Sequence, residues 1–335
     1  MSDLFSMIGS ENAQDQFLNL AFQGEIKKKF QGNSGLVYLV KNDSVSPKFI
    51  AYKRCKYLTD EGRTLFEEEI MKWNSITSRY IVPIFYVHII LNEYFACMRA
   101  CHGSLVDLMQ GSFDETSAYV YALQLVKGMI DINNSSIIYH QDLNPQNILY
   151  EDLSQLFKDF PSNNMHPSHR FRLMISDFAM SNYYIKNNID GKSGGKFPFK
   201  APEQYSSTNI EGFKPDHFAL GVILCMLFTN KHPCGYQPNE ILRKNPKKLK
   251  TSWESWAVVG KMTVDFHNEN VANLILSLLC PEPNARPDFK RCFEVLEQEF
   301  QKHDSVQCEI SKFYIEYFEK QSIDYPREKI NFRLN

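Results

Sequence analysis

Long apolar runs, an excess of charge of one sign and cysteine pairs with CxxC spacing are all absent from this 335-residue sequence. The longest apolar stretch, residues 218–228, is much shorter than the roughly 20 residues that a membrane-spanning helix needs. The 37 Lys and Arg residues nearly balance the 39 Asp and Glu residues, so the overall charge gives no long-range attraction to nucleic acid or to an anionic membrane. We therefore expect no nucleic acid and no membrane among the partners of this protein.

The eight cysteines are scattered through mostly apolar segments, without the CxxC spacing that is typical of structural zinc sites. Cys97 and Cys101 are the nearest pair. A redox or metal-binding role for this pair is the alternative to reduced core thiols, which we favour. Residues 1–14 have no basic segment followed by an apolar run, so we expect no secretory signal. These features favour a cytoplasmic location, with the nucleus as the alternative.

Hydrophobic residues make up 43% of the chain, which is enough to build a sizeable core. Short strand-like segments, separated by turns rich in Gly, Asn and Ser, lie at residues 26–30, 36–40 and 49–52. Residues 59–73 then carry apolar side chains at helical spacing, and residues 80–98 return to a strand-like composition. This part of the chain predicts a small antiparallel sheet with one helix.

Beyond Gly103 the apolar spacing becomes helical. The segments with this spacing are residues 118–132, 216–229, 271–280 and 287–300. The sequence therefore predicts an α+β, bilobal fold. A small β-rich N-lobe with one helix occupies residues 25–101, and a larger, mostly α-helical C-lobe occupies residues 102–300.

Three further segments complete the predicted organisation. Residues 1–24 form an N-terminal extension, residues 151–170 form a polar loop insertion, and residues 301–335 form a C-terminal tail with an aromatic amphipathic helix. His166 and His169 lie in the insertion. Because no third ligand accompanies them, we expect both histidines at the surface rather than on a metal ion.

The most specific string in the sequence is YHQDLNPQNIL at residues 139–149. It places Asp142 and Asn147 five residues apart in a polar loop between apolar segments. Phosphoryl transfer uses such a pair, because a carboxylate can orient the attacking hydroxyl while an amide oxygen holds a metal ion that neutralises the phosphates. Asp177 follows a second apolar segment and could hold the other side of the metal.

These strings resemble the HRD-x4-N catalytic loop and the DFG turn of the eukaryotic protein kinase superfamily. The resemblance implies that Asp142 is a catalytic residue that orients the substrate hydroxyl. It implies that Lys53, in a string similar to the VAIK strand, binds the α- and β-phosphates of ATP, and that Glu69 positions Lys53. It further implies that Asn147 and Asp177 bind Mg²⁺ or Mn²⁺.

Later motifs follow the kinase order as well, so that the resemblance covers roughly residues 25–300. The KAPE string that ends at Glu203 resembles the APE motif, and Asp216 resembles the start of the D-x-W-x-x-G helix. Arg286 resembles the late arginine that pairs with the APE glutamate. Order and spacing together make accidental agreement very improbable, although each short motif alone is weak.

The same resemblance implies a nucleotide site built from a glycine-rich loop, the lysine strand and a hinge. Besides Lys53, Asn147 and Asp177, it assigns to ATP Gly32, Gly35, Val37, Ala51, Met98, Ala100, Cys101 and Asp107. Phe30 stands where the first glycine of the loop is usual, and a plain hairpin turn is the alternative interpretation of Gly32 and Gly35. Asp107 would meet the ribose, and a surface helix start is its alternative.

Four positions depart from the kinase pattern. They are Gln141 for the HRD arginine, Asn144 for the loop lysine, Ala179 for the DFG glycine, and Lys196 for the threonine that braces the catalytic aspartate. Loss of the loop lysine removes a fixed cation near the γ-phosphate, at a cost of roughly 10²–10³ in rate, and Gln146 does not restore the charge. Lys196 could supply this cation, but a solvated loop lysine is the interpretation that we favour.

Two hypotheses for the function follow. One is an ATP- and Mg²⁺-dependent serine/threonine kinase that acts on a protein substrate. The other is a pseudokinase, a nucleotide-dependent scaffold that binds a regulatory protein. Within the superfamily, the loop HQDLNPQNIL is most similar to the unfolded-protein sensor kinase/ribonuclease and the 2-5A-dependent ribonuclease. Those relatives carry a ribonuclease domain after the kinase domain, and we expect none here, because residues 301–335 are too few to form it.

Overall fold

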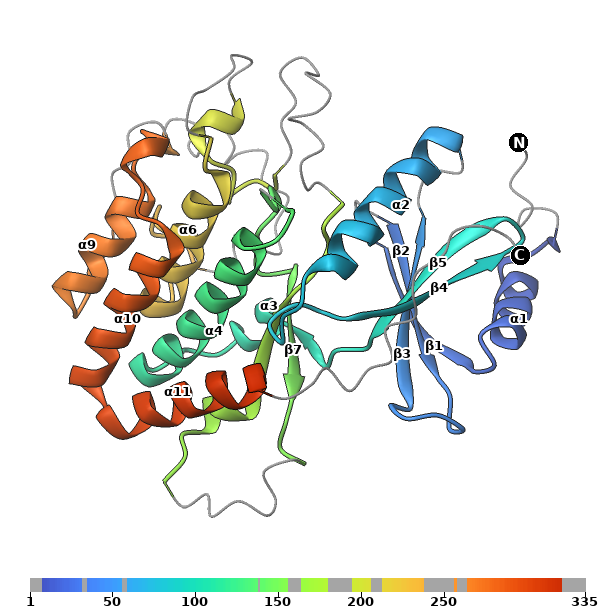
Figure 1. Cartoon of the computed structure of the whole chain (residues 1–335), viewed down its shortest axis with the longest axis horizontal. Helices are drawn as coiled ribbons and strands as arrows, with labels where there is room; N and C mark the ends of the chain where they lie inside the picture. Colours follow the sequence, from blue (N-terminus) through green and yellow to red (C-terminus); the bar gives the residue numbers. More distant parts are fainter. Residues whose placement is uncertain are drawn as a thin grey trace. The chain divides into compact units, whose positions relative to one another are not determined.

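The computed structural model describes residues 8–31, 35–55, 59–137, 139–155, 164–179, 195–205, 213–237, 256–257 and 264–320. The chain divides into two compact units (Figure 1). The first includes Met1–Ile76 and Val82–Ala100, and the second includes Thr77–Ile81 and Cys101–Gln321. The first unit is rich in strands and the second is mostly helical, which confirms the predicted α+β fold with two lobes. None of the described helices is both long enough and apolar enough to cross a bilayer.

An antiparallel sheet with the strand order β1-β2-β3-β5-β4 forms the body of the first unit (Figure 1). Its strands are β1 (Glu25–Gln31), β2 (Gly35–Lys41), β3 (Phe49–Cys55), β4 (Ile84–Ile90) and β5 (Glu93–Arg99). Leu91 and Asn92 join β4 to β5 with positive φ angles of 51° and 61°, as in a two-residue hairpin turn. Helix α2 (Asp60–Ser75) starts at the N-cap Thr59 and contacts β3 and β4.

One face of this sheet is covered by an N-terminal helix, α1 (Glu11–Ala21). Tyr38 and Tyr52 are cross-strand partners on that face. They pack in one core cluster with Leu18 of α1 and with Phe22, whose ring stacks on that of Tyr52 at 4.0 Å between centroids. This stretch of the predicted N-terminal extension is therefore part of the core of the first unit.

Polar contacts fix the position of α1 along the sheet. Lys29 of β1 places its Nζ 2.6 Å from Glu11 and 2.7 Å from Asp15. The Asn19 side-chain oxygen accepts a hydrogen bond of 2.7 Å from the backbone N–H of Ile26. The ion pairs are partly exposed and contribute little stability, so the buried apolar contacts are the main source of α1 docking.

The second unit is built mainly from helices that pack against one another (Figure 1). They are α4 (Glu115–Asn133), α6 (Pro215–Thr229), α9 (Glu269–Leu278), α10 (Phe289–His303) and α11 (Ser305–Lys320). Residues 215–227 of α6 are all buried. A helix that is apolar on every side belongs at the centre of a core, and α6 occupies that position here.

A small sheet and several short helices complete the second unit. The sheet joins β6 (Gly103–Ser104), β7 (Ile148–Asp152) and β8 (Phe171–Ile175) in that order. The short helices are α3 (Leu105–Leu108), η2 (Pro167–Arg170), η3 (Pro202–Tyr205) and η4 (Pro283–Ala285). The polar insertion lies between β7 and β8, while the predicted site residues lie in the loop before β7 and in the loop after β8.

The described end of the insertion packs on the C-terminal helix α11. Gln307 Oε1 accepts hydrogen bonds from the backbone N–H of His166 (2.9 Å) and from His169 Nε2 (3.1 Å). Gln307 Nε2 donates to the carbonyl of Asn164 at 2.5 Å. His169 is only 5% exposed, so the prediction of a surface histidine is wrong for this residue. The insertion and the tail are predicted as separate segments, and no feature of the sequence indicates this contact.

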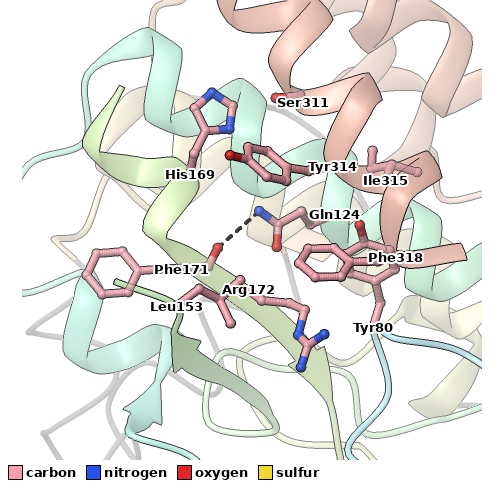
Figure 2. Close-up of a pocket in the computed structure, with 10 residues that line it drawn as sticks. All are labelled: Tyr80, Gln124, Leu153, His169, Phe171, Arg172, Ser311, Tyr314, Ile315 and Phe318. Atoms are coloured by element: carbon pink, nitrogen blue, oxygen red, sulfur yellow. Dashed lines mark hydrogen bonds between the residues drawn. The ribbon is translucent and has the colours of Figure 1, made fainter. Parts of the chain in front are cut away.

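Beside this contact lies a hollow of about 20 Å³ between α11, α4 and β8 (Figure 2). Tyr314 and Phe318 of α11 point toward it, and the Arg172 guanidinium lies 4.9 Å from the Phe318 ring centroid. A volume of this size holds about one water molecule, which excludes a small-molecule ligand. The hollow is therefore part of the packing of α11 against the unit.

We expect Leu18→Ala to destabilise the first unit by about 2–5 kcal/mol, because the side chain is 1% exposed and its loss leaves a cavity in the core. The matched control is Leu20→Ala on the same helix, where the side chain is 79% exposed and the change should stay within about 0.5 kcal/mol. Urea unfolding followed by circular dichroism measures both variants. Equal effects would show that α1 does not dock on the sheet in solution.

Acid should loosen the contact between the insertion and α11. Burial lowers the pKa of His169 to about 4, so between the usual histidine value of 6.5 and pH 4 the unfolded chain binds a proton that the folded chain does not. Stability from this site is complete above pH 6.5, and about 2 kcal/mol of it is lost between pH 7 and pH 5.

His169→Gln removes this titration and should reduce the loss of unfolding free energy between pH 7 and pH 5 by about that amount. The exposed His267 provides the matched control, His267→Gln. Urea unfolding at the two pH values measures the difference. A pH dependence of His169→Gln equal to that of the wild type would rule out a buried neutral His169.

Candidate active site

A buried ion pair lies between β3 and α2 in the first unit. Lys53 Nζ is 2.6 Å from Glu69 Oε1, and the two residues are 3% and 7% exposed. Glu69 lies on the apolar stripe of α2 with Phe66, Ile70 and Trp73, so burial of that stripe places the carboxylate against β3. A buried carboxylate is costly unless it is paired, and Lys53 supplies the partner. The structure thus brings together the predicted phosphate-binding lysine and its predicted positioning glutamate.

The other nucleotide-site candidates of the first unit line the same face of the sheet as Lys53. Val37 pairs with Lys53, and Ala51 pairs with Met98. Alternate residues of a strand share a face, so these four side chains face the same side, opposite to the side that α1 covers. Their placement agrees with a shared ligand surface, although their roles stay a prediction.

Gly35 is the described part of the predicted glycine-rich loop. Its φ of 156° and its position require glycine, because a Cβ there would lie 2.7 Å from the carbonyl oxygen of Arg54. Gly32 lies outside the described residues. Ala100 is half-buried directly after β5, and Cys101 is a half-buried thiol at the start of the second unit.

Asp107 caps the short helix α3. Its Oδ2 accepts hydrogen bonds from the backbone N–H (2.8 Å) and the hydroxyl (3.1 Å) of Ser104. The structure therefore shows the helix start that was the alternative for this residue. A contact with the ribose stays a prediction.

A buried carboxylate at the start of α6 holds the loop before β7. The two oxygens of Asp216 accept hydrogen bonds from the backbone N–H groups of His140 (2.7 Å) and Gln141 (2.8 Å). Burial raises the pKa of Asp216, and both N–H donors act against that rise. The ring of His140 is fully buried, hydrogen-bonds through Nε2 to the Ser176 carbonyl (3.0 Å) and packs on Phe178. One carboxylate and one imidazole thus connect this loop to α6 and to the loop after β8.

Asp142 and Asn147 are joined by hydrogen bonds within the loop. Asn147 Nδ2 donates to the backbone carbonyl (2.9 Å) and to Oδ2 (3.0 Å) of Asp142. Because the amide nitrogen is used in this way, the amide oxygen of Asn147 is the atom that could coordinate a metal ion. Ser176 donates to the Asn147 carbonyl from its backbone N–H (2.8 Å) and its hydroxyl (3.0 Å). These bonds hold Asn147 next to the strand end that precedes Asp177.

Asp177 stands after β8 in the left-handed region, with φ of 66°, and is followed by the buried Phe178. The negative charge of Asp177 affects the pKa of Asp142. Burial raises the pKa of Asp142 to about 6 and the charge of Asp177 adds to the rise, whereas His140, Asn147 and Lys196 oppose it. The two carboxylates and the Asn147 amide therefore share one electrostatic environment.

This donor set fits a magnesium ion that is held largely by a nucleotide. Among the described residues, no three His, Cys, Asp or Glu side chains lie close enough to hold a metal by themselves. Mg²⁺ commonly takes only one or two protein oxygens, with phosphate oxygens and water as its other ligands. Asn147 and Asp177 supply two hard oxygen donors of that kind, and Mn²⁺ accepts the same atoms.

The substituted positions of the loop have definite structural roles. Asn144 is 1% exposed, donates from Nδ2 to the Asp142 carbonyl (2.8 Å) and accepts from the Gln146 backbone N–H (3.0 Å). Gln141 holds the loop through the hydrogen bonds of its backbone N–H and carbonyl groups. Its buried side-chain amide has no hydrogen-bond partner among the described residues. Ala179 is half-buried after Phe178. Position 144 is therefore a brace of the loop and carries no charge.

The favoured interpretation of Lys196 as a solvated loop lysine is wrong. Lys196 is half-buried, and its Nζ donates a hydrogen bond to Gln146 Oε1. Burial lowers the pKa of Lys196, and the neighbouring Asp142 carboxylate raises it. The ammonium group thus lies within the electrostatic reach of the predicted catalytic aspartate.

The APE-like glutamate forms the predicted buried pair with the late arginine. Arg286 binds Glu203 through both nitrogens, with Nη1–Oε1 at 2.5 Å and Nη2–Oε2 at 2.8 Å. Arg286 and Glu203 are 2% and 5% exposed. This pair fixes η3, and with it the segment that contains Lys196, against the helices of the second unit.

Two residues that position the site were missed in the sequence. Gln204 donates from Nε2 to the Gln141 carbonyl (3.3 Å) and accepts from the Ala201 N–H (2.8 Å), so it joins η3 to the catalytic loop. Trp73 lies with its ring centroid 5.8 Å from Lys53 Nζ. Trp73 had the helical spacing of a core residue, whereas nothing in the sequence marked Gln204.

The sequence profile of the protein kinase domain matches residues 26–300. The chain is similar to serine/threonine-protein kinase ULK1 of Homo sapiens, with 26% identity over 236 residues, 70% of this chain and 21% of the relative. It is similar to mitogen-activated protein kinase kinase 1 of Arabidopsis thaliana, with 27% identity over 233 residues, 68% of this chain and 59% of the relative. It is also similar to CBL-interacting protein kinase 10 of Oryza sativa subsp. japonica, with 26% identity over 272 residues, 79% of this chain and 52% of the relative.

The matched part of the chain spans between 21% and 59% of the length of these relatives. They give no support to the narrower resemblance to the kinase/ribonuclease branch. The family profile covers most of both units and includes the Lys53–Glu69 pair, the Asp142–Asn147 pair and Asp177. On this evidence the chain belongs to the protein kinase domain family, with serine/threonine kinases among its relatives.

Proposed function

We propose that this chain binds ATP with Mg²⁺ and transfers the γ-phosphoryl group to a serine or threonine hydroxyl of a protein substrate. The observation that carries the proposal is the Asp142–Asn147 pair, joined by two hydrogen bonds and electrostatically coupled to Asp177. This arrangement offers a base for a hydroxyl and two oxygen donors for a metal ion. The similarity to serine/threonine kinases supports the choice of acceptor.

Asp142 accepts a hydrogen bond from the substrate hydroxyl and so directs its oxygen at the γ-phosphorus. As the new O–P bond forms, the bond between the γ-phosphorus and the leaving ADP oxygen breaks, and the hydroxyl proton passes to Asp142. Asn147 and Asp177 would hold Mg²⁺, and the ion would neutralise phosphate charge when bound. Lys53 holds the α- and β-phosphates, and Glu69 keeps the Lys53 ammonium in place.

A second candidate function is a pseudokinase, in which nucleotide binding stabilises a shape that a regulatory protein recognises. Asn144 favours it, because this residue braces the loop where active kinases of the resembled type carry a lysine. Both functions require ATP. They differ in whether the γ-phosphoryl group is transferred to a protein substrate.

Saturating ATP with Mg²⁺ should raise the stability of the protein, because a ligand that binds only the folded state stabilises it by about 2.7 kcal/mol at 100 times its Kd. Asp177→Asn should lose the part of the stabilisation that depends on Mg²⁺. The exposed Asp265 supplies the matched control, Asp265→Asn, which should behave as the wild type. Thermal denaturation with and without nucleotide, Mg²⁺ and EDTA measures these effects. An unchanged midpoint at saturating ATP would remove both candidate functions.

Asp142→Asn should lower the rate of phosphoryl transfer by about 10²–10⁴, because it removes the base but keeps the shape of the side chain. Transfer is measured with radiolabelled ATP and a peptide mixture that contains Ser, Thr and Tyr, followed by phosphoamino acid analysis. The variant should keep the thermal shift with ATP. A wild type that shifts with ATP and transfers no label would favour the pseudokinase, and label on tyrosine alone would exclude the serine/threonine acceptor.

A further inference from the structure

The loop that holds Asp142 lacks a positive charge of its own. Asn144 occupies the position of the kinase lysine, and both ends of its side-chain amide are used in hydrogen bonds within the loop. It is 1% exposed, so it cannot turn toward a substrate without breaking these bonds. If the loop is to stabilise negative charge on a phosphate, the cation must come from another segment.

Lys196 reaches this position from a segment 50 residues further along the chain. Its Nζ donates to Gln146 Oε1, two residues from Asn144. Lys196 and Asp142 each shift the pKa of the other, which places the ammonium within the electrostatic field of the carboxylate. The charge of Lys196 therefore acts on the residue that would receive the hydroxyl proton.

The backbone around Lys196 is fixed by packing. Gly195 has a φ of 103°, and a Cβ at this residue would lie 2.8 Å from Gln204 Nε2 and 3.1 Å from the Gln141 carbonyl oxygen. Phe199 is 2% exposed, and its N–H donates to the Lys196 carbonyl at 2.7 Å. Close packing on the catalytic loop thus determines where the Lys196 side chain starts.

Gln146 is suited to hold an ammonium group without neutralising it. Its amide oxygen accepts one of the three N–H donors of Lys196, while the amide carries no net charge. The two remaining donors and the full positive charge are then available for phosphate oxygens. A carboxylate at the same position would hold Lys196 more strongly but would cancel its charge.

We propose that Lys196 binds the terminal phosphate of ATP and supplies the cation that position 144 lacks, with Gln146 as its positioning residue. Asn144, Gln146 and Lys196 together then replace the loop lysine of the kinase pattern. The positive charge is supplied by the segment before Pro198 instead of by the loop that holds Asp142. This inference rests on the proposed phosphoryl transfer for its catalytic part. Its binding part requires only that the protein takes up ATP.

The test compares Lys196→Met with Lys196→Arg, and uses Lys290→Met, an exposed lysine of the same unit, as the matched control. Lys196→Met should lower kcat by about 10²–10³. It should also reduce the preference for ATP over ADP, measured by calorimetry with Mg²⁺, by at least about tenfold, because a hydrogen bond to a charged phosphate is lost. Lys196→Arg should keep most of the wild-type kcat and most of the preference for ATP over ADP, and Lys290→Met should match the wild type in both quantities.

A second variant separates a catalytic cation from a structural one. Gln146→Glu would strengthen a merely structural contact with Lys196 and leave kcat unchanged. If Lys196 acts on phosphate, the added carboxylate cancels its charge, and both kcat and the preference for ATP should fall about tenfold or more. A thermal midpoint close to that of the wild type shows that the variant is folded.

The outcomes for Lys196 and for the proposed function are distinguishable. Wild-type transfer together with an unchanged kcat and ATP preference in Lys196→Met would overturn the role of Lys196 and leave the kinase function standing. Absence of wild-type transfer would overturn phosphoryl transfer and the catalytic part of the inference. In that case a reduced ATP preference in Lys196→Met would support the phosphate contact, and an unchanged preference would overturn it.

Discussion

The carboxylate of Asp216 accepts hydrogen bonds from two successive backbone N–H groups, and the geometry of the catalytic loop depends on this interaction. The bonds to His140 and Gln141 fix the backbone where Gln141 turns through a φ of 67°. A positive φ is unfavourable for glutamine, so an external constraint must hold it. Asp216 can provide the constraint because it sits in the first turn of α6, the most deeply buried helix of the second unit.

Hydrogen bonds connect this constrained backbone to the residues of the proposed active site. His140 extends it to the loop after β8 through the Ser176 carbonyl, and Asn147 is held by Ser176 in turn. Gln204 donates a hydrogen bond to the Gln141 carbonyl and so connects η3 to the same loop. The Glu203–Arg286 pair holds η3 at its other contact. One connected set of buried polar contacts therefore positions the segments that carry Asp142, Asn147, Asp177 and Lys196.

The sequence predicted the parts of the site that depend on short strings in a fixed order. Lys53, Glu69, Asp142, Asn147 and Asp177 were assigned in this way, because the order and spacing of the strings can be seen in the sequence itself. The docking of α1 and the position of Lys196 could not be predicted from such strings. The docking of α1 depends on a sheet face that forms only when Tyr38 and Tyr52 pair across strands, although Ser10 and the spacing of Leu18 and Phe22 were available as a helix signal.

Lys196 was misinterpreted for a related reason. The sequence allows both interpretations, a replacement for the charge missing at position 144 and a solvated loop lysine, and it does not contain the distance that decides between them. Whether a charge is lost depends on distances between segments, and Gln146 and Lys196 are 50 residues apart. His169 shows the same limit, since its partner Gln307 lies 138 residues away.

Two of the buried ion pairs, Glu203–Arg286 and Lys53–Glu69, show why stability alone does not explain this chain. Removing two charges from water costs several kcal/mol per ion, and well-packed apolar residues often serve a core equally well or better. Glu203 and Arg286 use both ends of a bidentate contact together with the Cys280 carbonyl, so their charges are well satisfied and their role is to fix η3. The Lys53 ammonium lies 2.6 Å from a Glu69 carboxylate oxygen, and both residues are nearly as buried as the first pair. For this pair the proposed function supplies a reason beyond stability, because a nucleotide phosphate is a ligand that needs an ammonium at that place.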